Sequence, residues 1–233
     1  MIGRIKSTAP LALVIGVLAL AWTDLALNFT FHWFTNGDLG NGLSLPDSFH
    51  LVVPAAFVTW GFFFAAGADV AAFVKVVTAS VTGGLAALGA MAAASATADL
   101  PDFWGIALWV GIFATVLVLV SAAGDWHYVP AAFGAFASVF FWWTATGLDH
   151  WAPDGGGIGN SLKALGDPAT AGAGAFGGVI STPFVYVWLS ITVSLLCGCL
   201  LGLLSVKLAA LVTPRSAAGA EAEVVDQHSS PTS

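Results

Sequence analysis

The chain has 233 residues, of which 58% are hydrophobic and only 8% charged, with a formal net charge of −7. A soluble domain is roughly a quarter charged, so this composition excludes an ordinary water-soluble enzyme. The sequence has no cluster of Lys and Arg to neutralise phosphates, which also excludes nucleic acid as a partner. The partner that the composition predicts is the lipid bilayer.

A transmembrane helix needs roughly 20 apolar residues to cross the hydrocarbon core. The sequence contains six candidate runs, of which the second and fifth are the shortest: about 10–31, 50–68, 72–97, 103–122, 128–147 and 182–211. We therefore predict an all-α membrane protein with six transmembrane helices in a single domain, residues 1–212. The tail, residues 213–233, has no periodicity and is predicted to be disordered in the cytoplasm.

The first run follows Arg4 and Lys6, and its start also resembles a cleavable signal peptide. The run continues to Phe31, which is longer than an ordinary signal core, so we expect it to be retained as a helix. It contains Asp24, a carboxylate that costs roughly 2.5–3.5 kcal/mol to insert and is by default a candidate functional group. We expect His50 to be its partner. The alternative is that Asp24 bonds a backbone group or stays protonated in an interhelical contact.

The third run consists largely of Gly, Ala, Ser and Thr, which allow helices to approach closely in lipid. This composition predicts a helix at the centre of the bundle. Its glycines, among them Gly83, Gly84 and Gly89, also suit a protein that only packs against other helices or forms a homo-oligomer.

The pentapeptide VPAAF occurs twice, at Val53–Phe57 and Val129–Phe133, and each copy opens a short span rich in aromatic residues. A histidine precedes each copy, His50 in the first and His127 in the second. A proline in the first helical turn lacks an N–H, and the free amides around it can face a polar cavity. The alternative is that the prolines merely begin helices and the phenylalanines merely pack. The candidate pathway or gate residues are Asp24, His50, Pro54, Phe57, Trp60, His127, Pro130 and Phe133.

The distribution of Lys and Arg predicts the orientation of the chain. With a cytoplasmic N-terminus, five of the six basic residues lie inside and only Lys163 lies outside. Both termini are then cytoplasmic, and the two VPAAF copies enter the membrane from opposite sides. This arrangement predicts two inverted three-helix repeats, about 10–97 and 103–211, with a pathway near the midplane.

The short aromatic span after a proline, the small-residue helix and the second Val-Pro-x-x-Phe span resemble the YcdZ-like bacterial inner-membrane proteins, a family of uncharacterised function. The resemblance covers roughly 10–147 and, more weakly, the last helix. It implies a multi-pass protein of the bacterial cytoplasmic membrane and no particular activity. The long outer loops and the tail depart from that family.

The residue patterns predict neither a cofactor nor a metal site. Cys197 and Cys199 lie two residues apart in an apolar run, so on a helix they point to different faces. The polar loop at residues 149–157 matches no metal-binding spacing, and its glycines lack the Lys-Ser/Thr ending of a phosphate loop.

The function that these features favour is a passive channel or facilitator for a small, weakly charged solute. Asp24 and His50 are the only candidate members of a proton relay. Because such a relay usually needs more than one buried carboxylate or histidine, ion-coupled transport is less well supported. The alternative is a non-transporting scaffold or accessory subunit. We expect no enzymatic activity, since the sequence has no nucleophile with a base, no metal cluster and no cofactor motif.

Overall fold

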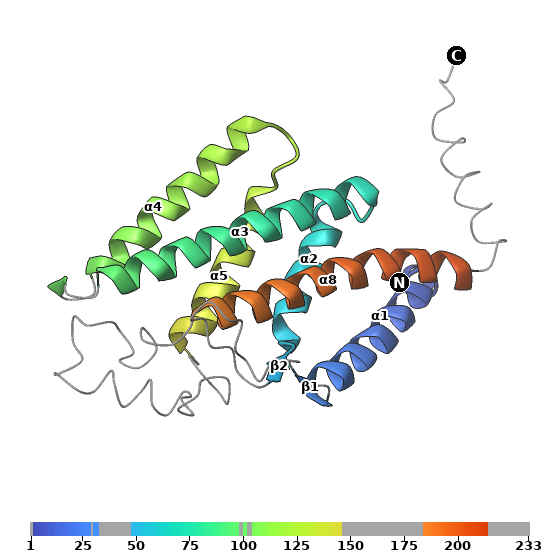
Figure 1. Cartoon of the computed structure of the whole chain (residues 1–233). Helices are drawn as coiled ribbons and strands as arrows, with labels where there is room; N and C mark the ends of the chain where they lie inside the picture. Colours follow the sequence, from blue (N-terminus) through green and yellow to red (C-terminus); the bar gives the residue numbers. More distant parts are fainter. Residues whose placement is uncertain are drawn as a thin grey trace, which may run out of the picture.

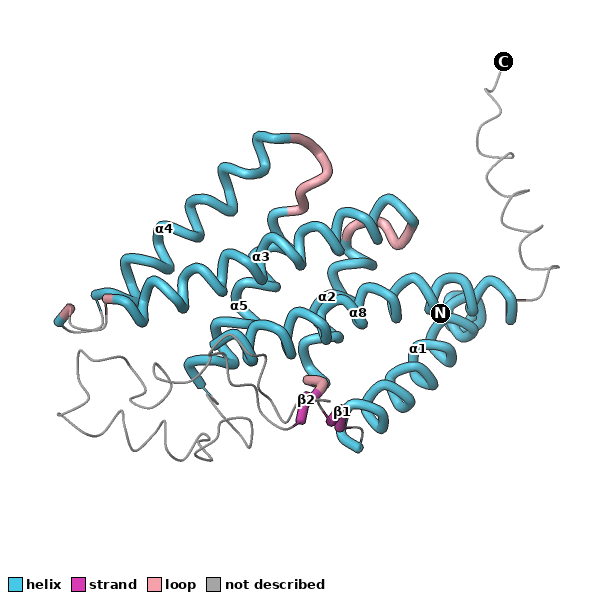
Figure 2. Tube along the Cα trace, in the orientation of Figure 1, coloured by secondary structure: helices cyan, strands magenta, loops and turns pink. Residues whose placement is uncertain are grey.

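The computed structural model describes residues 2–28, 30–32, 48–97, 100–101, 104–145 and 184–213. Most of the two predicted outer loops, about 32–49 and 148–181, and the predicted tail beyond Thr213 lie outside these residues. Helices dominate the described part, with one short strand pair (Figures 1 and 2). The elements are α1 (Ile2–Asn28), β1 (Thr30–His32), β2 (Ser48–His50), α2 (Val53–Ala65), α3 (Val70–Ala96), α4 (Trp104–Val120), the 3-10 turn η2 (Ser121–Ala123), α5 (Val129–Ala145) and α8 (Phe184–Val212).

Each of the six predicted spans coincides with an α-helix, which confirms the all-α prediction in outline. Four helices of the described part, α1, α3, α4 and α8, are long and apolar enough to cross a membrane. The two VPAAF helices, α2 and α5, are shorter, with 13 and 17 residues. A 13-residue helix rises about 20 Å, less than the roughly 30 Å of a hydrocarbon core. The structure is that of a membrane protein with four candidate full-length spans.

Two short strands separate α1 from α2, where the sequence predicted a longer first helix. The helix ends at Asn28, and Thr30–His32 then pairs antiparallel with Ser48–His50, with Thr30 opposite His50. The first strand has the sequence Thr-Phe-His, in which a β-branched and an aromatic residue favour extended backbone. The pairing places the start of α2 beside the end of α1 (Figure 1).

Local sequence signals explain where the central helices begin. Pro54 occupies the first turn of α2, where its missing N–H costs no hydrogen bond. The turn after α2 contains Gly67 with φ of 119°, a conformation that suits glycine. Asp69 then caps α3 by accepting a hydrogen bond of 2.6 Å from the Ala72 N–H. These signals make the connection between the second and third helices very short.

The helices pack in matching pairs. Helix α3 packs on α5 and α8 packs on α2, while α3 and α8 also contact each other. Helix α4 packs on α3 and α1 packs on α8, so α4 and α1 lie at opposite sides of the bundle (Figure 1). The set of contacts is unchanged when α1, α2 and α3 are exchanged with α4, α5 and α8. As the sequence predicted, the small-residue helix α3 is central, with contacts to α2, α4, α5 and α8.

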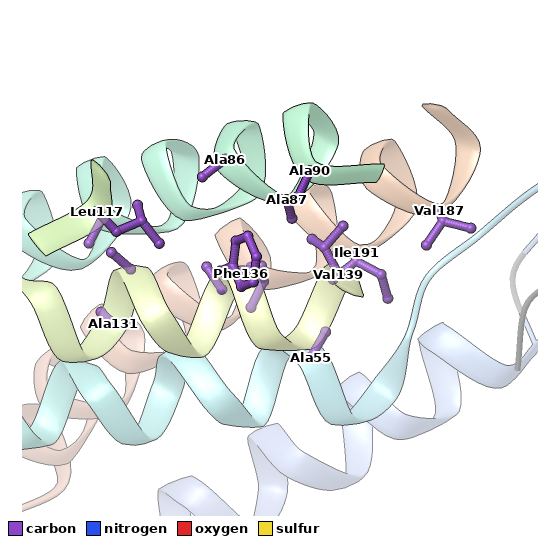
Figure 3. Packing of buried hydrophobic residues seen from close by; sticks show 14 of the residues in the cluster. Ala55, Ala86, Ala87, Ala90, Leu117, Ala131, Phe136, Val139, Val187 and Ile191 are labelled. Atoms are coloured by element: carbon purple, nitrogen blue, oxygen red, sulfur yellow. The ribbon is translucent and has the colours of Figure 1, made fainter. Parts of the chain in front are cut away.

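The core consists mainly of small side chains. Ala87 and Ala90 of α3 face Phe136 and Val139 of α5, with Ile191 of α8 close by (Figure 3). Small residues at these positions let the helix backbones approach, which is how helices associate in lipid without a hydrophobic driving force.

Large apolar side chains cover the outer helices instead. On α1, Leu13, Val17 and Leu20 are exposed, and on α4 Leu108 and Leu119 are exposed. Such apolar surfaces are unfavourable in water and favourable against lipid tails, which agrees with a membrane environment.

Candidate functional site

The two VPAAF copies have the same orientation relative to the core. The alanine pairs, Ala55 with Ala56 and Ala131 with Ala132, are buried. The prolines are exposed, and Phe57 and Phe133 have exposed fractions of 40% and 36%. In both copies of the repeat, the alanines therefore lie against neighbouring helices and the phenylalanine lies on the outer side.

A glycine of a long helix packs closely against each alanine pair. A β-carbon on Gly83 of α3 would collide with the carbonyl oxygen of Ala132, and one on Gly198 of α8 would collide with that of Ala56. Ala56 and Ala132 are equivalent positions of the repeat. The glycines allow the backbones of α3 and α5, and of α8 and α2, to touch.

Among the candidates Phe57, Trp60 and Phe133, Trp60 is the one whose ring is buried in the bundle. It is buried in α2, and its indole N–H donates to the hydroxyl of Ser205 on α8 over 2.9 Å. The Ser205 hydroxyl in turn donates to Leu201 O of its own helix. Trp60 thus fixes α2 against α8, and its polar edge already has a partner.

His127 ties the α4–α5 connection to α3. Its ring is buried, with Nε2 lying 3.1 Å from Leu117 O and Nδ1 lying 3.4 Å from the Thr82 hydroxyl. A carbonyl oxygen only accepts, so Nε2 carries a proton and donates it to Leu117 O. The neighbouring Trp126 carbonyl also accepts a hydrogen bond from Thr78. This histidine, which lies just before α5, therefore contacts both α4 and α3, as a structural polar group does.

The structure adds a set of buried hydroxyls on α8 that the sequence analysis did not single out. Ser194 accepts a 2.8 Å hydrogen bond from the Val52 N–H at the start of α2. Thr59 of α2 donates to Leu195 O of α8. The buried hydroxyl residues of α8 are Ser190, Thr192, Ser194 and Ser205.

A signal for this face was present in the sequence. Ser190, Ser194, Gly198 and Gly202 follow one another at four-residue intervals, which places them on one side of a helix. Thr59 of α2 and Ser80 of α3 are buried as well, and the Ser80 oxygen lies 3.9 Å from the sulfur of Cys199. The buried hydroxyls of the described helices therefore gather where α8 meets α2 and α3.

The comparison with protein families assigns this chain to a family. A family described as a protein of unknown function, DUF1097, matches residues 12–210, which run from α1 to α8. The chain belongs to the DUF1097 family. The comparisons with curated proteins and with solved structures gave no match. The match takes in all six helices of the described DUF1097 fold, and the family brings no activity with it.

Asp24 does not share the packing face of α1 in this DUF1097 protein. Trp22 and Ala26 are buried, and the Trp22 indole N–H donates to Val53 O of α2. Asp24, between them, is exposed. His50 pairs through its backbone with Thr30, and its side chain lies outside the described residues. The pairing of Asp24 with His50 stays a prediction.

The thiols of the DUF1097 chain are both free, with Cys199 buried and Cys197 half-buried on α8. Among the residues that the structure describes, no three His, Cys, Asp or Glu side chains gather into a group that could hold a metal ion. The buried polar side chains of the described residues carry hydroxyls, indole N–H groups and the His127 imidazole, with no Asp, Glu, Lys or Arg among them. What this arrangement can offer chemically is hydrogen bonding.

Proposed function

We propose that this chain is a membrane channel or facilitator for a small, weakly charged solute. The observation that carries the proposal is the row of buried hydroxyls where α8 meets α2 and α3, represented by Thr59, Ser80 and Ser194. Hydroxyls can exchange hydrogen bonds with a passing solute, whereas the described core offers no buried charge to bind an ion. The proposal gives the chain no catalytic role.

The proposed architecture is two inverted three-helix repeats, α1 to α3 and α4 to α8. Two observations support it. The set of helix–helix contacts stays the same when the two halves are exchanged, and Gly83 approaches Ala132 as Gly198 approaches Ala56. In such a fold, short spans meet near the midplane across a two-fold axis in the membrane plane. The shortness of α2 and α5, and their contact with each other, suits that role.

The proposed location is the bacterial cytoplasmic membrane, with both termini in the cytoplasm. The resemblance to YcdZ-like proteins and the positions of Lys75 and Lys207, against Lys163 alone outside, support this orientation. Fusion of a reporter that is active only in the cytoplasm to each terminus tests it. Activity at one terminus only would require an odd number of spans and would contradict the repeat.

Solute flux tests the proposed function. Liposomes that contain the full-length protein should take up urea, acetamide or glycerol faster than empty liposomes. Ser80→Val, within the α3–α8 contact, should slow the uptake, while the outward-facing Phe57→Leu should leave it unchanged. If Phe57→Trp and Phe133→Trp slow uptake and Ser80→Val does not, the pathway lies outside α2 and α5 instead. Equal rates with and without protein across the panel would remove the proposal.

The second candidate is a non-transporting membrane scaffold or accessory subunit. The equivalent exposure of Phe57 and Phe133 favours it, because two matching aromatic positions on the outer surface suit contact with another membrane helix or a second copy. Absence of flux, together with a defined oligomer that Phe57→Ala and Phe133→Ala dissociate, would support this candidate.

A further inference from the structure

Helices α2 and α5 correspond position by position, because both begin with VPAAF and each meets a glycine of a long helix at its second alanine. Gly198 of α8 lies against Ala56, and Gly83 of α3 lies against Ala132. Positions of α8 and α3 are therefore equivalent when they are equally far from these glycines. The contact of α2 with α8 and the contact of α5 with α3 are two versions of one helix pairing.

Helix α2 is hydrogen-bonded to α8 from its start to its second half. The Val52 N–H, just before α2, donates to the hydroxyl of Ser194 over 2.8 Å. The indole N–H of Trp60 donates to the hydroxyl of Ser205 over 2.9 Å. Thr59 also donates to a carbonyl oxygen of α8. Because hydrogen bonds are directional, these three fix the position of α2 along α8.

The equivalent positions of α5 and α3 carry no polar side-chain group. Ala79 and Ala90 of α3 lie at the same distances from Gly83 as the two bonded serines of α8 from their glycine. On α5, Ala135 and Phe136 stand where α2 has its threonine and tryptophan. These four side chains are buried in one apolar cluster (Figure 3). None of them can form the bonds that tie α2 to α8.

Helix α5 is held by hydrogen bonds at its start. His127, two residues before the helix, lies 3.1 Å from Leu117 O of α4 and 3.4 Å from the Thr82 hydroxyl of α3. The Trp126 carbonyl oxygen accepts a hydrogen bond of 3.0 Å from Thr78. The close glycine contact with α3 follows within the first turn of α5. These contacts lie together at one end of the helix, where they can act as a pivot.

We propose that α5 is a moving helix, which tilts about its start while its later turns slide along the apolar side chains of α3. Helices α2 and α8 form the fixed part of the bundle. Small sliding of packed helices is an established kind of conformational change, and an apolar contact permits it because no directional bond has to break. This inference goes beyond the proposed function and does not depend on solute transport.

The first test measures distances between spin labels in the full-length protein, in lipid nanodiscs and without the two native cysteines. Phe141→Cys with Ala96→Cys labels the ends of α5 and α3, and Ala65→Cys with Leu211→Cys labels the equivalent positions of α2 and α8. All four native side chains are exposed, so the labels fit. The distribution for the α5–α3 pair should be broader by roughly 1–2 Å or more. Equal widths for the two pairs would overturn the proposal.

Variants of the bonded positions test the cause. Trp60→Phe with Ser205→Ala removes both partners of one bond, so that neither is left unpaired, and should broaden the α2–α8 distribution. Ala90→Ser with Phe136→Trp places the same pair between α3 and α5 and should narrow theirs. Ser138→Ala is the control, since that hydroxyl bonds its own helix, and should change neither. Unchanged widths in both double variants would overturn the proposal, because hydrogen bonds would then not decide which helix moves.

Hydrogen exchange of the unlabelled native protein gives an independent measurement. Backbone amides of residues 133–141 should exchange about tenfold faster than those of the equivalent residues 57–65, as expected when two or three interhelical bonds are missing. Exchange in α5 as slow as in α2 would contradict a moving α5. Faster exchange in α5 without any solute flux would support this inference and overturn the proposed channel instead.

Discussion

Gly198 of α8 lies so close to the carbonyl oxygen of Ala56 on α2 that no side chain fits between them. The same relationship recurs between Gly83 of α3 and Ala132 of α5. These two contacts hold together the two main helix pairs of the bundle, and they fall at equivalent positions of the VPAAF repeat. The packing of these two helix pairs therefore depends on Gly198 and Gly83.

Gly198→Ala and Gly83→Ala should each destabilise the folded protein by about 1–3 kcal/mol or more, because the obstructing atoms belong to the backbone and cannot rotate away. Thermal unfolding in detergent measures the effect. Gly61→Ala on α2 and Gly111→Ala on α4 are the controls, since an added β-carbon meets nothing within 4 Å at either position. Equal melting temperatures for all four variants would refute the close approach.

Ser194→Ala should cost about 1–3 kcal/mol of folding free energy, because the Val52 N–H at the start of α2 then stays buried without an acceptor. Ser138→Ala is the matched control, as the Ser138 hydroxyl bonds only Gly134 O of its own helix. Chemical denaturation of the two variants in detergent compares the losses. A loss at Ser138 as large as that at Ser194 would argue against the interhelical bond.

His127→Ala should destabilise the protein more than His127→Gln, by about 1 kcal/mol or more. The glutamine amide can still donate to Leu117 O, where the imidazole Nε2–H donates in the native protein, and alanine leaves that buried carbonyl without its donor. Unfolding of both variants, with the surface change Trp126→Phe as a reference, gives the comparison. If glutamine proves no better than alanine, the carbonyl contact contributes little.

Ser80→Cys should form a disulfide with Cys199 on oxidation, because the native Ser80 oxygen lies 3.9 Å from the Cys199 sulfur across the α3–α8 contact. The experiment uses a Cys197→Ala background and titrates free thiols after denaturation. Val81→Cys, on the exposed side of the same helix, is the control and should keep its thiols free. Persistence of both thiols in the Ser80→Cys protein would place α3 and α8 further apart.

Much of the helical architecture follows from the sequence. The apolar runs located all six described helices to within a few residues, apart from the N-terminal extension of α1, because a chain in lipid must satisfy its backbone within each segment. Pro54 and Pro130 marked the first turns of α2 and α5, and the Gly and Ala content of α3 predicted its central place. The pathway hypothesis named Phe57 and Phe133, whose side chains have exposed fractions of 40% and 36%, and their part in a pathway stays a prediction.

What the sequence by itself determined is therefore the membrane class, the positions of the helices and the repeat that relates α2 to α5. The tertiary structure decided which side of each helix is inside: Trp60 turns inward three residues after the exposed Phe57, Gly84 meets Thr192 and Trp188, and Asp24 stays off the packing face. The physical reason is that a helix apolar on every side has no polar face to reveal its orientation. In lipid, only the fit of small side chains and the pairing of a few hydroxyls choose the inner face, and both depend on the neighbouring helix.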